Sequence, residues 1–240
     1  GGYRKINGYL NDYGTLSGTG NTLGVCVANG INDGILGCRK PTSGNNYLHY
    51  WNNSSSAWVA VTTSGSPTMT GVTKVRFYST FYQNHLFLAG DPAEKTNLYF
   101  SAPYNETSFS AADGAGVINV GFPIVAIKPF RDALYVFGTN NIRKLVGNNI
   151  SNFVLENITD DLGCLATDSV IEIGGDLLFL SQDGLRPISG TDKIGDVNLE
   201  TVSKDIQSIF TDIVFDIDLE GLNAVVLRHL TDCSLSTARC

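Results

Sequence analysis

Catalysis and metal binding need particular residue types at particular spacings, and this chain offers few of them. The three histidines, His49, His85 and His229, lie far apart, and none belongs to an HExxH motif or another metal-ligand spacing. The glycines of residues 17–24 lack the Lys and the Ser/Thr of a phosphate-binding loop, and no G-x-S-x-G elbow occurs. We therefore expect no enzyme, no metal and no cofactor. His85 directly precedes an apolar run, which predicts a turn or strand-edge position.

Neighbouring carboxylates are a second candidate chemistry, because a close pair can exchange protons or hold a cation. Asp160 and Asp161 lie in a polar connection, which favours a solvated turn over a site. The sequence SQDG at 181–184 is similar to the Asp-box turn of sialidase propellers, but its glycine follows the aspartate directly and no tryptophan comes after it. Asp-Gly suits the positive φ of a tight turn, so this segment predicts a β-hairpin.

Two tryptophans could bind a ligand or fill the core. Trp51 and Trp58 bracket the polar sequence NNSSSA. Exposed, they would stack on a sugar. Because a tryptophan buries so much area, we favour a pair that anchors two strands of one sheet against a neighbour.

The elements that position these residues recur along the chain. The segments DALYVFGTNNIRKLVG (132–147) and GDLLFLSQDGLRPISG (175–190) share an apolar run, a polar turn and a second strand-like run. The run NHLFLAG (84–90) is a third copy, and two weaker matches lie upstream and downstream. The anchor positions, 43 to 50 residues apart, are Leu36, Leu86, Leu134, Leu177 and Ala224.

Each period holds several short strand-like runs bounded by turn residues. In residues 124–163 they are IVAIKPF, ALYVFG, NIRKLVG and NFVLENI. Four short strands in roughly 40–50 residues are typical of a β-propeller blade. We therefore predict an all-β chain of four-stranded antiparallel blades, with the leucine runs as inner strands. Pro187 cannot donate to a ladder, which predicts an edge or a bulge there.

The blades are predicted to span residues 1–228. Residues 196–210 carry apolar positions at helical spacing and predict one short helical excursion. Residues 229–240 show no strand alternation and form an off-pattern tail. Propellers typically have about four to eight blades, so we expect this chain to be an incomplete propeller or part of a larger one.

Arg143 and Arg186 occupy matching places in two consecutive repeats. Equivalent positions should point the same way, so both side chains should lie at one rim or face. Arginine is enriched at protein interfaces. We expect both at a subunit interface, with a pair of solvated side chains as the alternative.

Composition and charge limit the partners. The net charge is −7, and the chain has no basic run of the kind that a free nucleic-acid reader uses to neutralise phosphates. No apolar run approaches the ~18 residues of a membrane span, so we expect no membrane insertion. The five cysteines are scattered without a C-x-x-C pair, which favours buried free thiols in a reducing compartment over a Cys26–Cys38 disulfide.

Four stretches together resemble the tail nozzle proteins of short-tailed phages, also called tail tubular protein B. More distantly, the chain is similar to the packaged-DNA stabilisation, or hub, propeller proteins of another short-tailed group. The stretches are GGYRKINGYL (1–10), LYFSAPYNETSFS (98–110), PFRDALYVFGTNNIRKLVG (129–147) and LGCLATDSVIEIGGDLLFLSQDGLRPISG (162–190).

The resemblance implies a structural virion protein without catalytic activity. It implies a β-propeller subunit of a hexamer in the virion tail, assembled in the bacterial host cytoplasm. Such a ring would contact the tail adaptor ring and the tail fibres or spikes, and double-stranded DNA would pass through it without sequence-specific binding. An acidic channel lining would repel the DNA and let it slide during ejection. The alternatives are a carbohydrate- or receptor-binding propeller of a tail adhesin, a propeller glycosidase and an interaction hub outside any virus.

Overall fold

The computed structural model shows an all-β chain made of small antiparallel sheets. Its described residues are 3–6, 9–12, 16, 18, 22–27, 35–39, 48–61 and 77–191. Several predictions fall outside them: the helical excursion at 196–210, the weak repeat near Ala224 and the tail 229–240, with His229.

Three four-stranded sheets and one three-stranded sheet follow one another along the described chain. Strands that are consecutive in sequence are neighbours in each sheet, so every sheet is an antiparallel meander. We call these sheets the first to fourth blades. The first blade holds β3 (Thr22–Val27), β4 (Ile35–Arg39), β5 (Leu48–Asn52) and β6 (Ala57–Ala60). The second holds β7 (Phe77–Tyr82), β8 (His85–Ala89), β9 (Asn97–Phe100) and β10 (Gly116–Asn119).

The third blade has the same plan, and the fourth shows three strands. The third blade holds β11 (Ala126–Phe130), β12 (Ala133–Phe137), β13 (Ile142–Val146) and β14 (Val154–Thr159). The fourth holds β15 (Ile171–Ile173), β16 (Asp176–Ser181) and β17 (Gly184–Pro187). The other elements are a hairpin of β1 (Tyr3–Ile6) and β2 (Tyr9–Asp12), the short 3-10 helix η2 (Ala111–Asp113) and the one-turn helix α1 (Ile188–Thr191). The predicted antiparallel blades are confirmed, and three of these four sheets have the predicted four strands.

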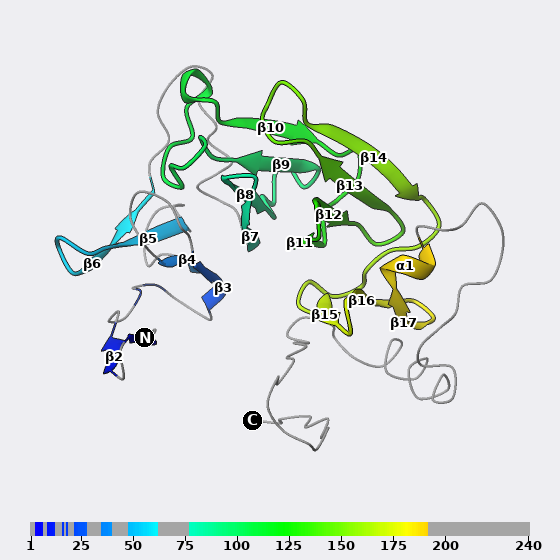
Figure 1. Cartoon of the computed structure of the whole chain (residues 1–240), viewed down its shortest axis with the longest axis horizontal. Coiled ribbons are helices and arrows are strands. Elements are labelled where there is room, and N and C mark those ends of the chain that lie inside the picture. The colour runs from blue at the N-terminus through cyan, green and yellow to red at the C-terminus, as the bar shows by residue number, and fades with distance from the viewer. Residues whose placement is uncertain are drawn as a thin grey trace.

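The blades are arranged in an arc (Figure 1). The first strand of each blade, β3, β7, β11 or β15, lies toward the inside of the arc, and β6, β10 and β14 lie toward the outside. In keeping with this arrangement, β7 contacts both β3 and β11. This is a propeller-like fold in which the sheets fan out from a common centre.

Successive blades pack face to face through apolar side chains. Strand alternation points Leu86 toward the first blade and Phe87 toward the third. Between the third and fourth blades, the rings of Phe137 and Phe179 lie 5.3 Å apart, centroid to centroid. A strand covered on both faces has no polar alternation, which explains the continuous apolar runs in the sequence.

The repeat positions Leu86, Leu134 and Leu177 are equivalent in space. Each is fully buried in the second strand of its blade and belongs to the cluster shared with the preceding blade. This confirms that the three runs are copies of one element. They are not the innermost strands, however, because β7, β11 and β15 lie nearer the centre.

The prediction that Leu36 is the equivalent of Leu86 in the first blade is wrong by one position along the strand. Leu36 clusters with Leu86 and Leu88, so it faces the following blade, whereas Leu86 faces the preceding one. A shift of one residue along a strand moves a side chain to the other face of the sheet. The weak sequence match therefore identified the correct strand in the wrong register.

Several smaller predictions are confirmed. SQDG forms the β16–β17 turn, with a φ of 117° at Gly184. Pro187 ends β17, which is an edge strand among the described strands. Trp51 and Trp58 are cross-strand partners with ring centroids 5.7 Å apart, so they join two strands of one sheet as predicted. They lie on the face turned away from the second blade, and their packing against a neighbouring sheet stays a prediction. Cys38 and Cys164 are both buried, as predicted, and Cys164 lies in the interface between the third and fourth blades.

Candidate functional site

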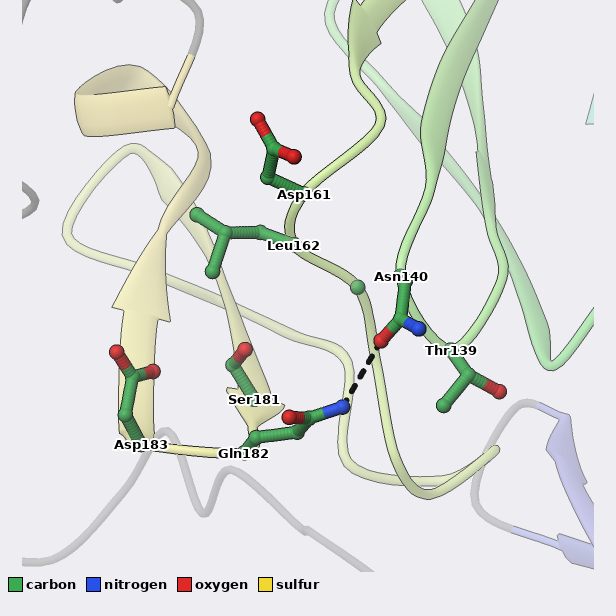
Figure 2. A pocket seen from close by; sticks show the side chains of 8 residues that line it. Thr139, Asn140, Asp161, Leu162, Ser181, Gln182 and Asp183 are labelled. Carbon is green, nitrogen blue, oxygen red and sulfur yellow. Dashed lines mark hydrogen bonds between the residues drawn. The ribbon is translucent and has the colours of Figure 1, made fainter.

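A small polar cavity lies where the third and fourth blades meet at one rim. Three segments form it: the β12–β13 turn, the connection that follows β14 and the β16–β17 turn (Figure 2). Its volume is about 130 Å³. It is lined by Thr139, Asn140, Asp161, Leu162, Gly163, Ser181, Gln182 and Asp183. We call it the rim pocket.

The blade repeat itself brings the two turns of the rim pocket together. Gln182 Nε2 donates a hydrogen bond of 2.8 Å to Asn140 Oδ1 across the interface (Figure 2). Thr139 and Gln182 hold matching places in the two repeats, because the third and fourth blades are offset by 43 residues. Stacking two copies of one hairpin therefore places equivalent polar turns side by side.

The connection after β14 can enter the rim pocket only because residue 163 is glycine. A Cβ at Gly163 would lie 2.1 Å from the Gly138 carbonyl oxygen and 2.4 Å from the Thr139 carbonyl carbon. The next residue fixes this approach, since Cys164 N donates a hydrogen bond of 2.8 Å to the Gly138 oxygen. Glycine is the residue that permits such a close approach of two backbones.

A partly buried ion pair supports one side of the rim pocket. Arg186 is only 4% exposed, and its Nε donates a hydrogen bond of 2.8 Å to Asp183 Oδ1. Its Nη2 also donates to Asp183 Oδ2. The hydrogen bonds from Arg186 hold the pKa of the Asp183 carboxyl below its usual value. Asp183 therefore stays ionised and fixed in orientation beside the cavity.

Arg143 occupies the same place one blade earlier. The two arginines pair across their sheets with equivalent residues, Val136 and Phe179. Arg143 Nη2 lies 3.2 Å from Asp160 Oδ1, and its guanidinium carbon lies 5.7 Å from the Phe122 ring centroid. The expectation that Arg143 and Arg186 point the same way is confirmed. Their role at a subunit interface stays a prediction.

The second blade has a related pair that the sequence analysis missed. Tyr99 pairs with Leu88, so it is the counterpart of the two arginines, and its hydroxyl donates to Asp91 Oδ2 at 3.3 Å. Each of these three blades thus links its third strand to a carboxylate at the same rim. An alignment of the repeats that continued beyond the apolar second strand into the third strand would have placed Tyr99 beside Arg143 and Arg186.

Asp160 is exposed, as predicted, but it is not a free turn residue. Hydrogen bonds from Asn141 at 3.0 Å and Asn157 at 2.8 Å lower the pKa of its carboxyl, and Arg143 adds to the effect. These contacts join the ends of β13 and β14 at the rim. Its neighbour Asp161 instead lines the rim pocket, so the two carboxylates act separately.

The described histidines do not contribute to the rim pocket. His85 begins β8 beside a turn, as predicted, yet it is buried. Its Nδ1 lies 2.6 Å from the Ser101 carbonyl oxygen, and its ring packs edge-on against Phe100 and Phe153. His49 lies on β5. Within the described ranges, no three His, Cys, Asp or Glu residues gather as a metal site.

Ser181, Gln182 and Asn140 are the lining residues that sequence reasoning assigned to turns alone. Their sequence signal is weak, because serine and asparagine are ordinary turn residues and a single glutamine belongs to no motif. Only the combination of the 43-residue offset with face-to-face stacking brings them together.

No protein-family model and no curated protein matches the chain. It is similar to solved extracellular domains of a one-component and a hybrid two-component system, both from B. thetaiotaomicron. Identities are 14% and 12%, and TM-scores are 0.42 and 0.45. Each match covers 82% of this chain but only 30% of the solved structure. A similarity at this level carries no functional argument.

Proposed function

We propose that this chain is a structural propeller segment of a short phage tail, a nozzle or hub subunit whose ring retains and then conducts the genome. One observation carries the proposal. The segments that bear the family resemblance, 129–147 and 162–190, fold as parts of two successive blades stacked through one apolar cluster. A conduit needs rigid walls, and close-packed blades provide rigidity because packed interiors compress little.

The same proposal sets the partners and the location. The subunit would form a hexamer in the virion tail, assembled in the bacterial cytoplasm, between the adaptor ring and the tail fibres or spikes. Arg143 suits a role between subunits, because its side chain is 25% exposed at the rim. Arg186 is buried against Asp183 and would support such a contact from within the blade. Across the described residues, no helix has the length and apolar character to cross a membrane.

Charge supports a conduit rather than a DNA-binding surface. The chain carries a net charge of −7, so its average field repels a polyanion. Repelled duplex DNA would slide through a ring without adhering to it. The proposal therefore includes an acidic channel lining.

The test is the assembly state of the purified full chain. Native mass spectrometry should give six copies per particle, and negative-stain images should show a ring with a central hole wide enough for duplex DNA. A monomer at all concentrations, or a closed particle without a hole, would contradict the proposal.

Charge reversal at the rim tests the interface separately. Arg143→Glu should reduce the hexamer fraction while circular dichroism shows unchanged strand content. Lys95→Glu makes the same charge change at an exposed site on the second blade and is the matched control. Equal hexamer fractions in the two variants would show that Arg143 does not contribute to the interface between subunits.

A further inference from the structure

Two buried polar atoms near the rim pocket have no partner within the described part of the chain. They are Ser181 Oγ and Arg186 Nη1, in residues that are 1% and 4% exposed. A buried polar group without a hydrogen bond destabilises the folded state, because it has lost its contacts with water. Ser181 also lines the rim pocket, so its hydroxyl faces a cavity that can admit a partner from outside the chain.

The lining of the rim pocket is rich in groups that donate and accept hydrogen bonds. Its described residues offer two hydroxyls, two amides and two carboxylates, and Leu162 is the one apolar side chain among them. Figure 2 shows these groups around the cavity, with Asp161 and Leu162 on one side and Ser181 and Gln182 on the other. Among the described residues, none of the lining side chains is aromatic. The described lining therefore offers hydrogen bonds rather than stacking.

Charge decides which kind of ligand fits. An anion would meet the carboxylates of Asp161 and Asp183. A metal cation would compete with the Arg186 guanidinium, which already holds both oxygens of Asp183. A neutral ligand avoids both the repulsion from the carboxylates and the competition with Arg186. Its groups should donate to the carboxylates and also accept from Ser181, which is the property of a hydroxyl group.

We propose that the rim pocket binds a neutral saccharide through its hydroxyl groups. One sugar hydroxyl accepts from Ser181 Oγ and a neighbouring hydroxyl donates to Asp161, while the Asn140–Gln182 bridge closes the side of the pocket. Arg186 is a positioning residue, since it reaches the pocket only through Asp183. The proposal stands on the pocket alone and does not depend on the tail function.

The experiment is an NMR titration of the full chain labelled with ¹⁵N. The probes are the methyl glycosides of glucose, galactose and mannose. At least one should produce saturable shifts of the side-chain amide signals of Asn140 and Gln182. Asp161→Asn and Ser181→Ala should each weaken binding by about tenfold or more, as expected for the loss of one hydrogen bond to a polar or charged group.

The control is Asp132→Asn, the same change at an exposed carboxylate of the β11–β12 turn outside the pocket. It should bind the glycoside as the parent chain does. Asp161 is exposed, so its variant remains informative if Ser181→Ala fails to fold.

Three results would overturn the proposal. The first is a response of the amide signals to calcium chloride or sodium phosphate and to none of the glycosides. The second is a glycoside that binds Asp161→Asn and the parent chain with the same affinity. The third is that none of the probes binds and a crystal structure shows only an ordered water on Ser181 Oγ.

Discussion

At the scale of single residues, the Arg186 guanidinium has one carboxylate partner among the described residues. Its side chain is 5% exposed, and Asp183 is the acid that neutralises it. We predict that Asp183→Asn lowers the free energy of unfolding by about 1–3 kcal/mol at pH 7, because a buried cation loses its counter-charge. The loss stays below that of a fully buried pair, since the Asp183 side chain is 45% exposed. Urea unfolding monitored by fluorescence measures it.

The pH dependence of the same variant has a definite sign. The folded-state pKa of Asp183 lies below the unfolded value, about 3.9. The ionised Asp183 contributes fully to the free energy of unfolding above its unfolded-state pKa. This contribution is lost as the pH falls through its folded-state pKa. The difference between parent and variant should therefore shrink between pH 7 and pH 3. A difference that grows in acid, or equals that of Asp132→Asn, would contradict the assignment.

At the scale of elements, the apolar clusters between blades hold the fold together. Leu134 is fully buried on β12 in the cluster shared with the second blade. We predict that Leu134→Ala costs about 2–5 kcal/mol, the range for a buried leucine that leaves a cavity. Val154→Ala on β14 is the control, because Val154 is 52% exposed and should change stability little. Similar losses in both variants would show that the leucine position is not core.

The sequence predicts these elements better than it predicts their register. Leu86, Leu134 and Leu177 are found by their period because both faces of each strand are covered, which makes the runs strongly apolar. Leu36 is assigned to the wrong face because Gly37 and Cys38 beside it weaken the pattern. The rim pocket is less predictable still: its turns follow from Gly and Asn, but the burial of Ser181 depends on how two blades stack.

At the scale of the whole molecule, the acidic balance makes a prediction about DNA. The purified chain should not retain a labelled duplex of random sequence, even at about 50 mM salt where electrostatic binding is strong. Fluorescence anisotropy of the duplex measures this. Binding that weakens steeply as salt rises would reveal a basic surface and contradict the conduit proposal.

The alkylation rate of Cys164 should report how fast the third and fourth blades separate. The thiol is buried in that junction, burial raises its pKa, and its Sγ donates to the Ala166 carbonyl oxygen at 3.1 Å. A protonated, enclosed thiol does not attack a maleimide. Alkylation of Cys164, followed by peptide mass mapping, should therefore advance only as fast as these two blades separate. Labelling as rapid as that of an unfolded control would mean that the junction opens freely.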